Sequence, residues 1–338
     1  MRFPGIVLLA ITVLVTGCSQ PPEQVNVYSA RKEALIKPLL DQFSADTGIT
    51  VNLVTAKADA LLERLKAEGE HSPADLLITV DAGRLHRAKQ AGVLQPLADS
   101  TLEQRIPATL RDPESFWYGL SVRARVIVYA PERVDAGQLE SYESLADEQW
   151  RGRICIRSSD NIYNQSLVAS LIAHNGEQAT EDWARAMVAN MARDPVGGDR
   201  DQIKAVAAGE CDLAVVNTYY LAMMASDDDP ATRAVAESVA VFWPNQDERG
   251  VHINVSGAGV TAHAANRDNA RQLLTFLTSD TAQQWYAERN HEYPAVEGIR
   301  VSEQLQGWGT FSQDDLNLSQ LGELNADAVK VMDRAGWQ

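Results

Sequence analysis

Short apolar runs alternate with amphipathic segments along most of this chain, and this alternation limits the fold more than any other feature. In the first third, strands are expected at 25–28, 49–54 and 75–80. Each is followed by a segment with helical spacing, at 32–45, 58–68 and 82–91. Pro38 lies inside the first of these segments and predicts a break or a late helix start. Such a series predicts an α/β fold with a mostly parallel sheet.

A long apolar run at 117–130 predicts an extended strand, and a second strand–helix series follows it. Its strands are expected at 153–157, 212–217, 239–243 and 253–261. Its helices are expected at 163–174, 181–192, 199–208, 219–225, 269–279, 281–289 and 327–334. Two series joined by extended segments near 116–123 and 239–245 predict two lobes. We expect lobe 1 to hold 25–118 and 246–298, and lobe 2 to hold 119–245 and 299–338.

The N-terminus has the pattern of an export signal. Arg2 precedes an apolar stretch at 6–15 that is too short to span a bilayer. The stretch ends in Val15-Thr16-Gly17-Cys18, which resembles a bacterial lipobox. We therefore expect a lipoprotein signal at 1–17, lipid on Cys18 and a tether at 18–24. The alternative is a plain secretory signal that happens to end near a cysteine.

The charge of the chain limits its partners. The formal net charge is −16 at pH 7, which argues against nucleic acid and against anionic membrane surfaces as partners. We expect a periplasmic monomer that meets the membrane only through its lipid anchor.

Two cysteines remain if Cys18 carries lipid. Cys155 and Cys211 lie in neighbouring strand-like runs, and an exported chain can hold a disulfide. A disulfide between them would brace two strands. Two buried free thiols are the alternative.

Tyrosines gather where strands give way to helices. Tyr219 and Tyr220 follow the apolar run 213–216, with Asn217-Thr218 offering helix-capping chemistry between them. Tyr28 ends the first strand, and Tyr163 falls in the first turn of a later helix. Ligands bind at the carboxyl ends of strands in open α/β sheets, and helix N-termini favour anionic groups.

These phenols suit a hard, highly charged cation. A free phenol has a pKa of about 10, so a metal must displace its proton before the oxygen can bind. Ferric iron is the hard and biologically common candidate. The alternative is that these tyrosines are ordinary core or cleft residues.

Several motifs of this chain resemble those of one protein family. They are Asn26-Val27-Tyr28-Ser29-Ala30-Arg31, Asn161-Ile162-Tyr163-Asn164-Gln165, the segment from Asp199 to Ala205, Asn217-Thr218-Tyr219-Tyr220, and Asp333-Arg334-Ala335-Gly336-Trp337. Together they resemble the periplasmic ferric-iron-binding proteins of ABC transporters, over nearly the whole mature chain. The resemblance implies an α/β, two-lobed periplasmic solute-binding fold with a hinge of crossing strands.

The resemblance also implies a ligand set. In the tyrosine-rich branch of the family, the iron ligands correspond to Tyr28, Tyr163, Tyr219 and Tyr220, and a charge-balancing arginine corresponds to Arg123. Four phenolates outweigh Fe(III) by one charge, which Arg123 would offset. Fe(II) would leave more negative charge unbalanced.

The chain departs from other branches of that family. Lys32 stands at a histidine position, and Val80, followed by Asp81, stands at a glutamate position. Met223 or Met224 stands where some relatives have an arginine. We therefore do not expect a His/Glu metal site.

The resemblance implies a binding protein that captures Fe(III) and delivers it to the permease and ATPase subunits of an ABC importer, and not an enzyme. Lobe closure is expected to complete the site. One alternative is a protein of the same fold for an oxyanion or another small solute, held by Arg123 or Arg157 and backbone N–H groups. Another is an exported hydrolase, although no nucleophile–base set stands out.

Overall fold

The computed structural model describes residues 23–338. The predicted signal peptide 1–17, the predicted lipidation site Cys18 and the tether up to residue 22 lie outside the described residues. No helix within 23–338 has both the length and the apolar character that crossing a membrane requires.

A single mixed sheet runs through the molecule in the order β2-β1-β3-β8-β4-β6-β5. Its strands are β1 (Gln24–Ser29), β2 (Thr50–Thr55), β3 (Leu76–Val80), β4 (Tyr118–Tyr129), β5 (Ile154–Cys155), β6 (Leu213–Asn217) and β8 (Ile253–Val260). Pairing is parallel among β1, β2 and β3 and between β5 and β6. It is antiparallel wherever β4 or β8 takes part. The prediction of a mostly parallel sheet is thus correct at the two ends and wrong in the middle.

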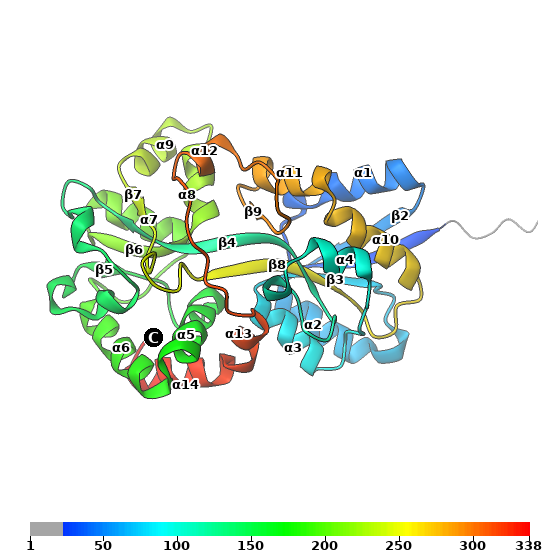
Figure 1. Cartoon of the computed structure of the whole chain (residues 1–338), viewed down its shortest axis with the longest axis horizontal. Helices are drawn as coiled ribbons and strands as arrows, with labels where there is room; N and C mark the ends of the chain where they lie inside the picture. The colour runs from blue at the N-terminus through cyan, green and yellow to red at the C-terminus, as the bar shows by residue number, and fades with distance from the viewer. Residues whose placement is uncertain (1–22) are drawn as a thin grey trace, which may run out of the picture.

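The middle of the sheet is antiparallel because two long strands cross between the lobes there (Figure 1). The first half of β4, up to Ala124, pairs with β8, and its second half, from Arg125, pairs with β6. The short strand β7 (Ala240–Phe242) pairs with this second half. The extended segment predicted near 239–245 is therefore part of lobe 2, and β8 is the second strand between the lobes. The exact residue boundaries of the lobes stay a prediction.

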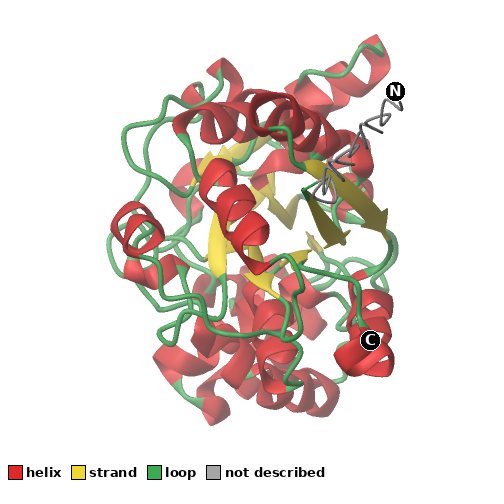
Figure 2. Ribbon diagram, turned by 90° about the vertical axis from the view of Figure 1, so that its right-hand side faces the viewer, coloured by secondary structure: helices red, strands yellow, loops and turns green. Residues whose placement is uncertain are grey.

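Helices cover both faces of the strands in each lobe (Figures 1 and 2). In lobe 1, α1 (Lys37–Thr47), α10 (Arg267–Leu277) and α11 (Asp280–Arg289) lie opposite α2 (Ala58–Glu68) and α3 (Ala82–Gln90). In lobe 2, α7 (Asp199–Ala208), α8 (Thr218–Ala225) and α9 (Pro230–Glu237) lie opposite α5 (Ile162–Asn175), α6 (Glu177–Asn190) and α14 (Asn325–Ala335). Helix α1 starts late, with Pro38 in its first turn, as expected.

The C-terminal segment contacts both lobes, although 299–338 was predicted to belong to lobe 2. The short helix α13 (Ser319–Glu323) packs against α3 of lobe 1 and α5 of lobe 2 before α14 packs on α5 and α6. A Cβ atom at Gly322 would lie 2.2 Å from Cβ of His86, so this approach requires glycine. Helix α13 therefore links the two lobes on the face of the sheet opposite α8 (Figure 1).

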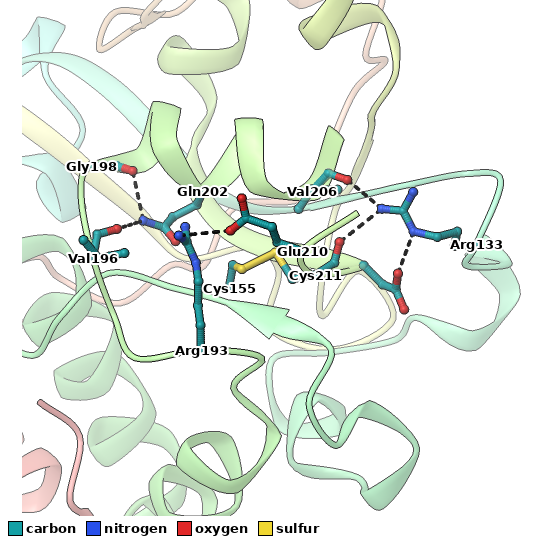
Figure 3. The surroundings of a disulfide bond; sticks show 10 residues. Arg133, Cys155, Arg193, Val196, Gly198, Gln202, Val206, Glu210 and Cys211 are labelled. Atoms are coloured by element: carbon teal, nitrogen blue, oxygen red, sulfur yellow. Dashed lines mark hydrogen bonds and ion pairs between the residues drawn. A yellow bond between two sulfur atoms is a disulfide. The ribbon is translucent and has the colours of Figure 1, made fainter. Parts of the chain in front are cut away.

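A disulfide joins Cys155 and Cys211, as predicted (Figure 3). Cys155 ends β5, and Cys211 lies two residues before β6. The Cα atoms are 5.8 Å apart, within the usual range for a disulfide. The bond ties the last residue of β5 to the residues that lead into β6, so on β6 it lies at the end away from Tyr219 and Tyr220.

Candidate metal centre

Tyr219 and Tyr220 occupy the first turn of α8, directly after strand β6. Strand β6 is buried along its length and ends at Asn217. This residue is the N-cap of α8, and its backbone is in an extended conformation. The two rings lie face to face at a tilt of 35°, with centroids 4.2 Å apart. Both side chains are half-buried.

Tyr163 joins this pair from another helix. It is the second residue of α5, after the N-cap Asn161. Its hydroxyl lies 3.3 Å from that of Tyr219. Three phenols from two helix N-termini thus converge, and helix N-termini carry a partial positive charge that attracts anionic groups.

One arginine links the two tyrosine-bearing junctions. Arg125 donates to Oδ1 of Asn164, on α5, over 2.5 Å and to Oδ1 of Asn217, at the end of β6, over 3.1 Å. Buried Asp199 accepts from Arg125 and also from the backbone N–H of Asn217, at 3.3 and 2.8 Å. These bonds fix α5 and α8 relative to each other, so the spacing of the three phenols is built into lobe 2.

Two cationic side chains lie next to the phenols. The guanidinium of Arg123 is 5.8 Å from the centre of the Tyr219 ring. The guanidinium of Arg157 is 6.0 Å from the centre of the Tyr163 ring, and it pairs with Asp199 at 3.4 Å. Arg123 favours the phenolate form of Tyr219, and Arg157 favours that of Tyr220, because a positive charge stabilises a nearby anion.

Without a metal, the tandem phenols hold their protons strongly. Burial, and then the neighbouring Tyr163 and Tyr220, raise the pKa of Tyr219 well above its ordinary value, against the effect of Arg123. Burial, and then the charges of Tyr163 and Asp199, raise the pKa of Tyr220 to about 12. A bound cation must therefore supply enough attraction to remove protons from groups that are neutral at physiological pH.

Tyr28 does not join this group, and its prediction as a metal ligand needs correction. Its hydroxyl donates to the carboxylate of Glu68 over 2.9 Å. Its ring packs between β1 and helices α2 and α3, against Leu61, Leu65 and Leu77, and the guanidinium of Arg64 lies 4.6 Å from the ring centre. Burial, and then the bond to Glu68, raise the pKa of Tyr28 to about 12. The residue belongs to the core of lobe 1.

The structure also identifies residues near the phenols to which we assigned no role from sequence. Asp199 lies in one of the motifs quoted above, but its type alone gives no sign that it accepts a backbone N–H at the end of β6. Arg125 stands two residues after Arg123, and strand alternation could have indicated a second arginine on the same side of β4. Among residues 23–338, there is no group of three or more His, Cys, Asp or Glu side chains that could hold a metal ion.

The two-lobed fold, with a polar site at strand-to-helix junctions beside the crossing strands, is that of a solute-binding protein. The family model described as "Bacterial extracellular solute-binding protein" matches residues 71–310, and the chain belongs to this family.

Several relatives of this chain have names that refer to iron. Iron uptake protein A1 of Synechocystis is 46% identical over 96% of this chain and 93% of its own length. The structure of FutA from Trichodesmium, in complex with iron and citrate ligands, is 50% identical, covers 93% of this chain and 100% of its own, and superposes with a TM-score of 0.91. The ferric binding protein from Campylobacter jejuni is 38% identical, covers 93% of this chain and 100% of its own, and has a TM-score of 0.88.

Proposed function

We propose that this chain captures ferric iron through the phenolates of Tyr163, Tyr219 and Tyr220 and delivers it to an ABC import permease. The observation that carries the proposal is the convergence of three phenols from two helix N-termini beside two arginines. Relatives named for iron uptake and for ferric binding support the choice of cargo.

The phenol oxygens of the site, and the need to displace their protons, both favour Fe(III) over a divalent cation. Phenolate is a hard, anionic ligand, and a trivalent cation attracts it more strongly than a divalent one at the same distance. Because the pKa of Tyr219 and Tyr220 is raised, the cation of higher charge has the advantage in removing their protons. Three phenolates also balance Fe(III) without residual charge, so the fourth phenolate that we expected from Tyr28 is not needed.

The position of the site supports uptake by lobe closure. All three phenols belong to lobe 2, while Arg123 lies on β4 where that strand still pairs with β8. Movement about β4 and β8 would change the distance between lobe 1 and the phenols. We propose that closure shields the bound iron and that opening at the permease releases it, with no chemical turnover.

The proposal also covers where in the cell the protein acts and which partners it meets. A family of extracellular solute-binding proteins is consistent with action in the periplasm. We propose that the protein works there as a monomer, anchored through lipid on Cys18, and passes iron to the permease and ATPase subunits of its importer.

Absorbance of the protein loaded with Fe(III) tests the site. Wild type should show a visible tyrosinate-to-iron charge-transfer band, because ionised phenols bound to Fe(III) absorb in that region. The double variant Tyr219→Phe with Tyr220→Phe should lose the band and reduce iron affinity by at least ~100-fold, since each phenolate lost removes a charged ligand.

Tyr163→Phe should weaken the band while keeping the fold. The matched control is Tyr142→Phe, which removes a buried hydroxyl of lobe 2 that bonds to the backbone oxygen of Arg125. An unchanged band in the double variant, or a colourless wild type that binds an oxyanion instead, would overturn the proposal.

A further inference from the structure

Three buried charged side chains form one chain of ion pairs beside the metal centre. Glu292, between α11 and the short strand β9 (Tyr293–Pro294), accepts from Nη2 of Arg31 over 2.8 Å and from Nη2 of Arg123 over 3.1 Å. The three side chains are 5%, 3% and 1% exposed, in that order. Two guanidiniums share one carboxylate, so the triad Arg31–Glu292–Arg123 carries a net charge of +1.

Serine hydroxyls fix this triad on the crossing strands. Ser256 of β8 accepts from both Arg31 and Arg123. Ser121 of β4 donates to Oε2 of Glu292 over 2.8 Å. Both carboxylate oxygens of Glu292 are engaged in ion pairs, because each accepts a hydrogen bond from a guanidinium. Removing Glu292 would therefore leave two buried positive charges without their shared partner.

The triad meets the site through Arg123, whose guanidinium is 5.8 Å from the centre of the Tyr219 ring. At its other end, the guanidinium of Arg31 is 5.6 Å from the ring centre of buried Tyr286. The titratable and charged groups that face the triad or Tyr219 from the surrounding elements are Asp81, Tyr163, Asp199, Tyr220 and Tyr286. None of these forms an ion pair with Arg123 in the structure, so Glu292 is the carboxylate that balances it.

Building on the iron-binding function proposed above, we propose that Glu292 is a positioning residue that sets the preference of the site for Fe(III) over Fe(II). Glu292 holds Arg123 next to the Tyr219 ring. Its negative charge offsets one of the two positive charges of Arg31 and Arg123. When an external one-electron reductant converts bound Fe(III) to Fe(II), the iron site gains one negative charge. Positive charge behind the phenols stabilises the reduced site, so Glu292 stabilises the ferric form.

Variants of the triad change its charge in known steps. Glu292→Gln raises the net charge from +1 to +2, and Arg31→Met lowers it to 0. The double variant returns it to +1, because it loses one group of each sign. The readout is the reduction midpoint of the Fe(III)-loaded protein, followed through loss of its charge-transfer band during titration with dithionite.

The expected order of midpoints is Glu292→Gln highest, wild type and the double variant in the middle, and Arg31→Met lowest. Each step should change the ratio of Fe(III) to Fe(II) affinity by about tenfold, which corresponds to ~59 mV for a one-electron couple. Arg31→Lys keeps the charge, and its midpoint should lie closer to wild type than that of Arg31→Met. A residue that matters merely for folding would not produce shifts of opposite sign.

Thermal unfolding of the iron-free variants provides a readout without metal. Glu292→Gln should have the lowest melting temperature, because it alone leaves two buried guanidiniums unbalanced, and the double variant should recover part of the loss. Midpoints of the two single variants that move in the same direction, or not at all, would reject the role of Glu292 while leaving iron binding intact. A wild type without a charge-transfer band would instead remove the proposed function, and this inference with it.

Discussion

At the scale of single residues, the direction of a strand side chain decides whether a tyrosine can reach the site. Tyr28 and Tyr219 both lie near the carboxyl end of a strand, as the sequence predicts. Tyr28 lies within β1, where alternate side chains point to opposite faces of the sheet, and its ring packs under α2 and α3. Tyr219 lies two residues beyond its strand, in the first turn of α8, where its side chain is free of that constraint.

Tyr28→Phe tests this distinction. The variant should keep the iron charge-transfer band and bind Fe(III) as wild type does, because the phenol bonds to Glu68 in the core of lobe 1. Its free energy of unfolding should fall by ~1 kcal/mol, the usual contribution of one buried hydrogen bond. Spectra and urea unfolding of the same preparation measure both effects. A large loss of the band would restore Tyr28 to the ligand set.

At the scale of elements, lobe 2 depends on short strands that are held by bonds beyond the sheet. Strand β5 is just two residues long, although the apolar pattern predicted five. Its pairing with β6 is supported by the disulfide and by Arg153, which bonds to Asp212 just before β6 at 2.6 Å. Residues 156–161 form the turn that leads from β5 into α5 and Tyr163.

Replacing both cysteines, as Cys155→Ser with Cys211→Ser, tests this support. The free energy of unfolding should fall by about 2–4 kcal/mol, because the unfolded chain regains the freedom of the 56-residue separation that the bond closes. The iron band of the folded variant should stay, since the tyrosine-bearing junctions are held by Arg125 and Asp199. Unfolding curves with and without reductant on wild type provide the matched comparison. A band that disappears while the variant is folded would show that the disulfide also shapes the site.

At the scale of the whole molecule, the lobes contact each other through a buried carboxyl group. Asp81 caps α3 of lobe 1 and accepts from the hydroxyl of Ser166, on α5 of lobe 2, at 2.8 Å. It also accepts from Asn254 of β8 at 2.8 Å. Burial raises the pKa of Asp81 above its ordinary value, although Ser166 and the backbone N–H of Gly83 oppose this. Between the unfolded pKa and this raised pKa, the folded state therefore binds more protons at Asp81 than the unfolded chain does.

Asp81→Asn should make stability less dependent on pH. Between the unfolded pKa, about 4, and the raised folded pKa, the folded state binds more protons, so the wild-type free energy of unfolding falls as pH rises. Asparagine removes that slope and tolerates the positive φ of 81° at this position. Ser166→Ala is the matched control, and it should steepen the slope because it removes a bond that favours the charged form. Urea unfolding from pH 4 to 8 measures both slopes, and parallel curves for all three proteins would contradict the prediction.

Much of the fold follows from local pattern. Helices α2 and α7 begin and end where their spacing and flanking glycines predict. Short helices such as α4 (Ser100–Arg105) and α13 were not predicted, because they are too brief to show a period. The antiparallel centre of the sheet was also missed. Strand direction there depends on which lobe the chain enters next, and no local pattern records it.

The sequence by itself determined the α/β class, the tandem tyrosines at a helix N-terminus and Tyr163 at another. These features depend on neighbours in the chain, through periodicity and capping. Tertiary structure alone decided that Tyr28 lies in a core and that a carboxylate at position 292 balances arginines at 31 and 123. Such partners are brought together by the crossing strands, and contacts between residues so far apart in sequence leave no periodic signal.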